Sequence, residues 1–298
     1  MRAVSLGLLL SCANAKKHTP ANTDAATPDA LLLVVKGRHV GSVWLKELFE
    51  LQAPAASFVH EANKCVQPVA GVVRLLDRGE CEKSEPAPLA GLSFNTGNFG
   101  TAGLSVWAKA AREARPAVQR PRVLVVSLIR TNAAKWAWSV YRHQSAGQES
   151  HVYADASAGR PSASGAVQAP PAKVPTDEIA QRMVHMAPRQ RAVQNDAVQL
   201  ARVLNATVVV HLTYEGLRED AQGAMSSLFR AAGVPFSAEA HRRGTSLQKG
   251  APEDLGRAIA NLDDLRAEPS LTAPCYQSMF SPKNVEIPPC DGGAPWLT

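Results

Sequence analysis

Apolar and polar residues follow one another in blocks that predict a series of strands and helices. Residues 31–36 and 122–129 are nearly continuous apolar runs of strand length, as expected for parallel strands buried on both faces. Residues 206–212 predict a third buried strand, and residues 57–60 and 91–95 predict two shorter ones. Apolar positions at helical spacing predict helices over residues 42–52, 67–77, 101–114, 131–143, 217–232 and 251–267. Residues 176–204 are predicted to be largely helical, with an interruption near Pro188.

The alternation of strands with helices predicts an α/β fold of three layers, with a central parallel sheet covered by helices on both faces. We expect one main domain over residues 31–270. Residues 145–175 are rich in Ala, Ser, Gly and Pro and predict a solvated, low-complexity insertion. Residues 271–298 are expected to form a C-terminal tail. Ligands of such sheets bind beyond the carboxyl ends of the strands, so the residues that follow each strand are the first candidates for a site.

The first thirty residues indicate export. Arg2 precedes a short apolar stretch and the Ala-Asn-Ala of residues 13–15, an order typical of a secretory signal peptide over residues 1–15. The apolar stretch is too short to span a bilayer, so we expect no stable membrane insertion after its removal. A bacterial lipoprotein signal that ends at Cys12 is the alternative. Polar residues 16–30 predict a flexible lead-in.

Cysteine usage agrees with an exported protein. Cleavage of the signal peptide leaves four cysteines, which permit three disulfide pairings. We predict the two local pairs, Cys65 with Cys81 and Cys275 with Cys290, the second of them in the C-terminal tail. The alternative is four unpaired thiols in a reducing compartment. The sequence contains no C-x-x-C spacing, so we expect no metal site.

The charge of the chain favours an anionic ligand without indicating nucleic acid. The formal net charge is +6 and the sequence pI is about 9.2. The basic residues are scattered, and no run of them is typical of a nucleic-acid-binding arm. A modest positive field suits a nucleotide or an acidic sugar polymer. The oligomeric state does not follow from these features.

The loop between the first buried strand and its helix predicts a phosphate or sulfate cradle. Free backbone N–H groups at a helix N-terminus bind such anions, and glycines let the backbone approach them closely. The residues expected to hold the anion are Lys36, Arg38, His39, Gly41 and Ser42. The loop is not a Walker A motif, because Ser42 rather than lysine follows Gly41. The alternative is an ordinary turn from strand to helix.

The strand at residues 122–129 repeats this plan. Arg130 follows it directly, and Ser139 lies two to three turns along the next helix. An arginine can bind a phosphate through two parallel hydrogen bonds, and a hydroxyl can add a third. Arg130 and Ser139 therefore predict a second phosphate site, although an exposed arginine at a helix start is the simpler alternative. Trp136 and Trp138 are expected to pack in the core.

Taken together, these segments resemble the sulfotransferases that use 3′-phosphoadenosine 5′-phosphosulfate. The resemblance spans about residues 31–260 and is nearest to the divergent carbohydrate-type members of the family. The segments that carry it are Gly41-Ser42-Val43-Trp44-Leu45 after a strand, Arg130 with Ser139-Val140-Tyr141, His211-Leu212-Thr213-Tyr214-Glu215-Gly216-Leu217, Ala232-Gly233-Val234, and more weakly Arg242-Arg243-Gly244-Thr245-Ser246.

The resemblance implies a P-loop-like architecture and the transfer of a sulfuryl group from that nucleotide to a hydroxyl, expected to be that of a carbohydrate. It implies an enzyme of the Golgi lumen or one secreted from the cell. The residues implied in nucleotide binding are Lys36, Arg38, His39, Gly41, Ser42, Trp44, Arg130, Ser139 and Arg243.

The general base is implied to follow the second strand. Glu61 comes first, since a glutamate serves in several carbohydrate-type relatives, and His60 is the alternative. His39 would contact the transferred group. Asn95 and Lys64 would border the acceptor. Tyr214 and Glu215 are expected to brace the end of the sheet rather than to catalyse, and no metal is implied.

The chain departs from the family pattern in the sulfate loop. His39 stands where the family has Lys or Arg, Val43 replaces a usual Ser or Thr, and the gap from Arg130 to Ser139 is one residue longer than in many cytosolic members. Two other functions remain open: an inactive secreted glycan-binding protein of the same fold, and a nucleotide or sugar kinase. The kinase needs a carboxylate for Mg²⁺ at a strand end, where the long apolar strands end in basic or neutral residues.

Overall fold

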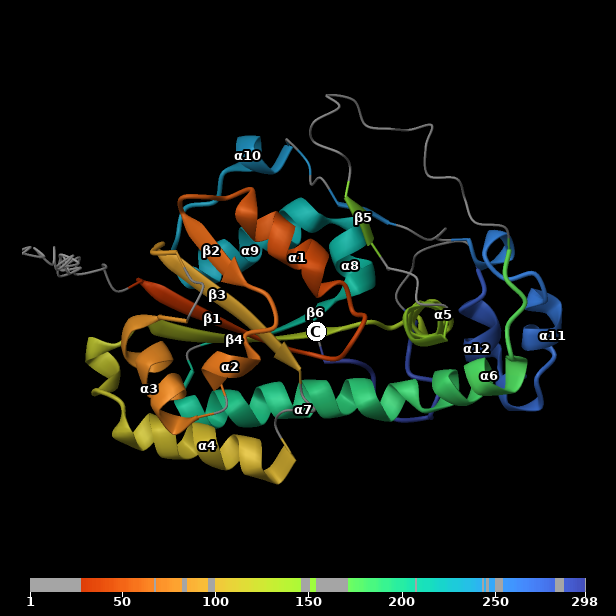
Figure 1. Cartoon of the computed structure of the whole chain (residues 1–298), viewed down its shortest axis with the longest axis horizontal. Helices are drawn as coiled ribbons and strands as arrows, with labels where there is room; N and C mark the ends of the chain where they lie inside the picture. Colours follow the sequence, from red (N-terminus) through yellow and green to blue (C-terminus); the bar gives the residue numbers. More distant parts are fainter. Residues whose placement is uncertain are drawn as a thin grey trace, which may run out of the picture.

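Five parallel strands form the central sheet of the computed structural model (Figure 1). Their order across the sheet is β2-β3-β1-β4-β6. Their bounds are β1 Ala30–Lys36, β2 Ala56–Val59, β3 Leu89–Asn95, β4 Arg122–Ile129 and β6 Val208–Thr213. The structure describes residues 28–66, 68–81, 85–95, 100–145, 151–153, 171–206, 208–242, 244, 247–249, 254–281 and 287–297. The predicted signal peptide and most of the predicted lead-in and insertion lie outside these residues.

Helices cover both faces of this sheet. Their bounds are α1 Ser42–Glu50, α2 Asn63–Val66, α3 Val69–Arg78, α4 Gly100–Glu113, α5 Ala133–Ser145, α6 Thr176–Val184, α7 Met186–Leu204, α8 Tyr214–Glu219, α9 Ala221–Ala232, α10 Ala238–Arg242, α11 Leu262–Arg266 and α12 Pro274–Ser278. A separate pair of short antiparallel strands, β5 His151–Tyr153 and β7 Leu247–Lys249, lies apart from the main sheet.

The alternation of side chains along β1 explains the three layers. Leu31, Leu33 and Val35 belong to a hydrophobic core that α3, α4 and α7 complete. Leu32 and Val34 point to the opposite face and pack in a second core with α1, α8 and α9. Figure 1 shows these two groups of helices on opposite sides of the sheet. The predicted α/β class with a central parallel sheet covered by helices on both faces is confirmed.

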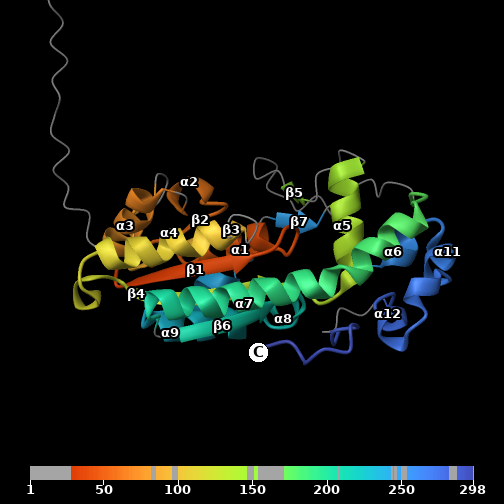
Figure 2. The same cartoon turned by 90° about the horizontal axis from the view of Figure 1, so that it is seen from below.

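After β1 the chain turns to one face of the sheet, and after its neighbours β3 and β4 it turns to the other face. From β1 it enters α1 on one face, whereas β3 leads to α4 on the other face. From β4 the chain passes through α5 and α6, which lie beyond the strand ends, and returns along the sheet as α7 (Figures 1 and 2). Such a reversal opens a crevice at the carboxyl end of β1, the usual place for a ligand in open α/β sheets.

Three predicted elements need correction. Residues 206–212 were expected to form a buried strand, but β6 is an edge strand whose residues are mostly half-exposed. The helix expected over residues 217–232 is two helices that meet at Asp220, whose side chain caps the second. Residues 251–267 do not form one helix: their described part holds a 3-10 turn, Leu255–Arg257, and α11. Ile259 between them forms a β-bridge with Ala172, which takes its backbone out of helical geometry.

Both predicted disulfides, Cys65–Cys81 and Cys275–Cys290, are present. The second lies near the C-terminal segment, which packs against α7: Arg191 pairs with Asp291, and the Gln194 amide exchanges hydrogen bonds with the Leu297 backbone. Within the described part of the chain, no helix has the length and apolar character needed to cross a membrane.

Candidate functional site

Strand register brings the predicted site residues to one edge of the sheet. Lys36, the last residue of β1, lies level with Asn95 at the end of β3 and with Leu128 in β4. Arg130 follows β4 directly, next to the Thr213–Tyr214 turn that ends β6, because Ile129 pairs with Thr213. These residues therefore lie at the carboxyl ends of four adjacent strands, β3, β1, β4 and β6.

Lys36 is the buried cation at the centre of this edge. Its side chain is 1% exposed, and its ammonium donates to Glu61 Oε1 at 3.2 Å and to Asn95 Oδ1 at 3.1 Å. Burial lowers the pKa of Lys36, although the Glu61 carboxylate acts in the opposite direction. Glu61, the implied general base, and Asn95, expected to border the acceptor, thus contact the same ammonium.

Glu61 is a half-exposed carboxylate in a fixed position. Its backbone has φ of 55°, an uncommon conformation for a non-glycine residue, and its N–H donates to Ser93 Oγ at 3.2 Å. Burial alone would raise the pKa of Glu61, but the charge and hydrogen bond of Lys36 prevail, and the pKa of this carboxyl lies below its usual value. Glu61 is consequently ionised at neutral pH and able to accept a proton.

The loop after β1 enters α1 without a side-chain cap. Gly41, the residue before the helix, has φ of 87° and has no side chain that could cap the first amides of α1. A Cβ on Gly41 would lie 2.3 Å from the ring of Tyr214, so only glycine fits here. The hydroxyl of Ser42 bonds instead to His60 Nε2 at 2.9 Å. Within the described part of the chain, the start of α1 is therefore not capped by the residue that precedes it.

His39 lies among cations, and burial together with their charges keeps its imidazole neutral. Burial lowers the pKa of its imidazole to about 4, and His143, Lys36, Arg38 and Arg130 all add to the effect. The ring centroids of His39 and His143 are 5.1 Å apart. His39 also has a positive φ of 58°. The surrounding cations disfavour protonation of the imidazole. A bound anion would offset their charge.

Arg130 is buried beneath the crevice with one donor unsatisfied. Its guanidinium lies 4.6 Å from the centre of the Tyr214 ring, and its Nε is 3.8 Å from Glu215 Oε1, too far for a hydrogen bond. Within the described part of the chain, Nε has no hydrogen-bond partner. A buried donor of this kind ordinarily has a partner, so its orphan state is a reason to expect a ligand nearby.

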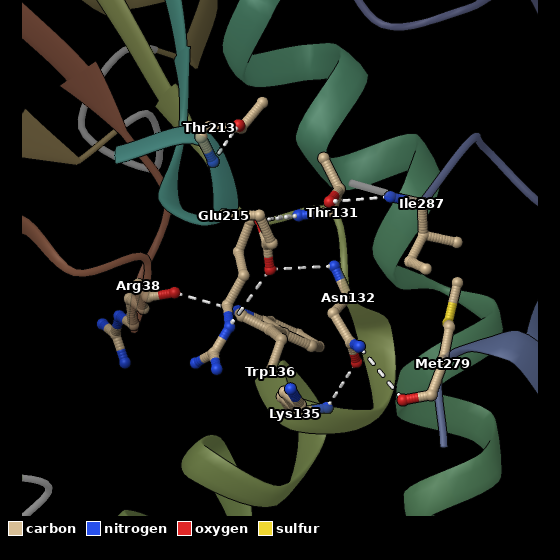
Figure 3. Close-up of polar contacts among 11 residues, drawn as sticks. Arg38, Thr131, Asn132, Lys135, Trp136, Thr213, Glu215, Met279 and Ile287 are labelled. Atoms are coloured by element: carbon tan, nitrogen blue, oxygen red, sulfur yellow. Dashed lines mark hydrogen bonds and ion pairs between the residues drawn. The ribbon is translucent and has the colours of Figure 1, made fainter. Parts of the chain in front are cut away.

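Glu215 closes the start of α5 (Figure 3). Its fully buried carboxylate accepts from the Thr131 amide at 2.9 Å and from the Asn132 amide at 3.2 Å. The Asn132 side chain accepts from the Lys135 amide at 3.0 Å and so caps the helix. The first backbone donors after β4 are therefore occupied by the protein itself.

The remaining predicted residues fall into three groups. Trp44 packs edge-on against Tyr214 with 6.1 Å between ring centroids, and Arg218 lies over its other ring face. Ser139 lies half-buried in α5, and its role with Arg130 in a second phosphate site stays a prediction. Arg243 and the side chain of Lys64 lie outside the described residues. The predicted core packing of Trp136 and Trp138 is confirmed.

Sequence reasoning missed the double hydrogen bond that Glu215 makes. A glutamate directly after a strand, in a turn before a helix, is a weak signal, and the partner amides lie more than eighty positions away. Sequence reasoning also missed Gln190, which lines a cavity beside Arg38. No group of three or more potential metal ligands occurs among the residues that the structure describes.

Comparison with known proteins gives a distant likeness and no family. No family model and no curated protein matches the chain. Among solved structures, the crystal structure of a sulfotransferase from Alicyclobacillus acidocaldarius is similar at 14% sequence identity, with a TM-score of 0.38, over 73% of this chain and 90% of that one. A likeness this distant carries no argument about activity, which has to rest on the residues of the site.

Proposed function

We propose that this protein is a sulfotransferase that moves a sulfuryl group from 3′-phosphoadenosine 5′-phosphosulfate to a hydroxyl, expected to be that of a carbohydrate. One observation carries the proposal. The helix start at Gly41 and the buried guanidinium of Arg130 follow adjacent strands of the sheet, and Lys36, Arg38 and Arg130 all act electrostatically on His39. Within the described part of the chain, the Nε of Arg130 has no hydrogen-bond partner. A nucleotide with anionic groups at both its 5′ and 3′ positions matches these two points.

The described residues fit such a nucleotide. The amides after Gly41 and the hydroxyl of Ser42 would hold the 5′ phosphosulfate, as helix N-termini hold anions. Arg130 would hold the 3′ phosphate, together with Ser139 if the resemblance holds. The ring of Trp44 is the nearest flat surface on α1 for the base, and Arg38 and His39 contribute to the positive field.

The chemistry requires alignment, charge stabilisation and a base. The acceptor oxygen forms a bond to sulfur as the bond between sulfur and the phosphate oxygen breaks, and that oxygen keeps the electron pair. Lys36 lies where its ammonium would stabilise the developing negative charge. Glu61, ionised and 3.2 Å from Lys36, would take the proton of the acceptor hydroxyl. His60, bonded to Ser42, is the alternative base.

Calorimetric titration with the product nucleotide tests the binding half of the proposal. We expect 3′-phosphoadenosine 5′-phosphate to bind, and Arg130→Ala to weaken it roughly 10- to 100-fold, as expected for the loss of charge-assisted hydrogen bonds. Adenosine 5′-phosphate, which lacks the 3′ phosphate, is the matched control ligand, and Arg130→Ala should leave its affinity unchanged. Absence of binding by either nucleotide at millimolar concentration would overturn the proposal.

A radiolabelled sulfate-transfer assay over a panel of glycans tests the catalytic half. Glu61→Gln should lower kcat by about 10²- to 10⁴-fold, the usual contribution of a general base, while the nucleotide affinity is retained. His60→Asn is the matched comparison; a larger fall for His60→Asn would reassign the base. Nucleotide binding without transfer by the wild type would favour the inactive glycan-binding protein, and heat from ATP with Mg²⁺ alone would favour the kinase.

The cellular location is part of the same proposal. Two disulfides are compatible with a secreted or lumenal protein, because such bonds persist mainly in oxidising compartments. A signal peptide over residues 1–15 would deliver the chain there. Expression of the full chain in eukaryotic cells, followed by N-terminal sequencing of the secreted or Golgi-retained product, tests this: an intact Met1 in a cytosolic fraction would contradict it.

A further inference from the structure

A cavity of about 360 Å³ lies beside the loop after β1. This volume falls near the lower end of the range found for small-molecule sites, roughly 300–1,000 Å³. The loop forms one wall, and α5 and α7 form the others. Its lining residues are Gly37, Arg38, His39, Trp136, Val140, Gln144, Arg189, Gln190, Ala192 and Val193. A molecule in it would lie next to the place where the sulfuryl group is proposed to bind.

The residues that line this cavity are either basic or uncharged. Arg38, Arg189 and His39 contribute to the wall, and none of the lining residues is acidic. Among the ion pairs of the described residues, none involves Arg38 or Arg189. A second cavity of about 380 Å³ along β2, which includes His60, is different, because Glu50 and Glu85 outnumber its one lysine. Only the first cavity suits an anion.

Gln190 supplies a polar group that the protein does not satisfy. It lies on the buried face of α7, at helical spacing with Val193, Gln194 and Ala197. The amide of Gln194 is satisfied by the backbone of Leu297. Gln190 is only 2% exposed, yet its Oε1 has no hydrogen-bond partner in the described part of the chain, and the residue lines the cavity. A buried amide oxygen without a partner at a cavity wall indicates a ligand that can donate a hydrogen bond.

The other walls are flat and apolar. Trp136 is held in place because its indole N–H donates to the Arg38 carbonyl at 2.9 Å (Figure 3). Val140 and Val193 add aliphatic surface on either side. Aromatic and aliphatic walls with a few placed polar groups are the usual composition of a small-molecule site, and an aromatic ring suits the apolar face of a sugar ring.

We infer that this cavity binds the acceptor, and that the acceptor is a sugar bearing a carboxylate beside its hydroxyls. The inference rests on the proposed function and names the substrate class for it. Arg189, with Arg38, binds the carboxylate; the Gln190 amide hydrogen-bonds a hydroxyl; and Trp136 packs against the ring. Of these residues, only Arg38 also belongs to the proposed nucleotide site, so Arg189 is the informative position.

Matched sugars test the inference without turnover. Binding of methyl β-D-glucuronide and of its neutral twin, methyl β-D-glucoside, is measured by ligand-observed NMR titration, with and without 3′-phosphoadenosine 5′-phosphate. We expect the glucuronide to bind at least about fivefold more tightly. Arg189→Gln should remove this preference, and Arg202→Gln, the same change elsewhere on α7, should leave it intact. Gln190→Leu should weaken both sugars and preserve the preference; melting curves confirm that each variant is folded.

The failures of the two proposals are distinguishable. Equal affinity for the two sugars, binding of neither, or a preference that survives Arg189→Gln would overturn the acceptor inference, whether or not the nucleotide binds. Absence of nucleotide binding in the calorimetric titration would overturn the proposed sulfotransferase activity. Were the glucuronide preference still lost in Arg189→Gln in that case, the cavity would be a binding site for acidic sugars in a protein without the transfer activity.

Discussion

The two passages from sheet to helix, after β1 and after β4, look alike in sequence and differ in structure. After β1, the first amides of α1 have no side-chain cap and Gly41 turns the chain with a positive φ. After β4, the carboxylate of Glu215 occupies the Thr131 and Asn132 amides, and the Asn132 side chain caps the helix. We call the first the open crossing (residues 37–44) and the second the closed crossing (residues 130–135).

Because of this difference, the open and the closed crossing would bind an anion in different ways. The open crossing offers backbone donors, so it can bind an anion directly. The closed crossing has already placed a negative group on its donors, and it presents only the side chain of Arg130, held between Glu215 and Tyr214. A phosphate at the closed crossing would therefore be bound by a positioned guanidinium rather than by a helix start. A strand followed by a helix is thus insufficient to define an anion site.

Glu215→Gln should give the largest effect on stability, because it breaks the closed crossing. The amide oxygen of the new side chain can still accept from one of the two backbone amides, Thr131 or Asn132, but its NH₂ group then faces the other. Arg130 also loses its buried counter-charge. Breaking a buried pair of this kind costs about 3 to 5 kcal/mol. Chemical denaturation of the variant measures the loss. Asp263→Asn, at an ion pair whose carboxylate is 94% exposed, should change stability by less than about 0.5 kcal/mol.

The nucleotide response of this variant sharpens the comparison. If Glu215 only closes the helix start, 3′-phosphoadenosine 5′-phosphate should raise the melting temperature of Glu215→Gln by at least as much as that of the wild type, since Arg130 then has no competing partner. A variant that is folded but shows no nucleotide-dependent stabilisation would mean that Glu215 is needed to orient Arg130. Equal stability of variant and wild type would contradict the closed crossing itself.

Gly41→Ala should come next, because it disturbs the open crossing. The new methyl would meet the buried Tyr214 ring and would occupy a backbone conformation that alanine disfavours. We expect a loss of about 2 to 4 kcal/mol in stability. Gly37→Ala is the matched control, since its nearest neighbour would lie at 3.7 Å and no positive φ is involved. Similar losses in both variants would show that Gly41 has no special place in the loop.

The fold could be predicted from the sequence where the pattern is local and strong. The central strands β1 and β4 are continuous apolar runs, and they lie within a residue of their predicted bounds. The prediction failed over residues 251–267, where apolar residues at helical spacing pack against α6 and form a β-bridge to Ala172 instead. It also failed for β6, because an apolar run does not indicate which strand lies at the edge of the sheet.

The site could be predicted only in part. Lys36 and Arg130 could be predicted because they end or directly follow a strand, and such residues meet at one edge of a parallel sheet. Gly41 could be predicted because it directly precedes the helix that follows β1. Neither the pairing of Lys36 with Glu61 nor the closure by Glu215 has a local signal, since these contacts join residues 25 and 84 positions apart. In sequence, Gln190 looks like any other polar residue of an amphipathic helix. Its difference from Gln194, whose amide hydrogen-bonds the Leu297 backbone, is visible only in the structure.

The smallest expected effect is a pH response confined to the open crossing. The pKa of His39 is about 4 in the folded protein and near 6.5 when unfolded. Between these values the unfolded chain binds the extra proton, so stability is lost as the pH falls from about 6.5 toward 4. Because His39 is only partly buried, we expect about 1 to 2 kcal/mol of this loss to depend on it.

His39→Asn isolates this contribution. Denaturation at pH 7 and pH 5 should show a smaller difference in the variant than in the wild type, and the other histidines with lowered pKa values, His211 and His241, cancel in the comparison. An anion in the open crossing opposes the surrounding cations and raises the pKa of His39, so nucleotide affinity should increase from pH 7 to pH 5 in the wild type and increase less in His39→Asn. Identical pH profiles for the two proteins would place the bound anion away from His39, and with it away from the open crossing.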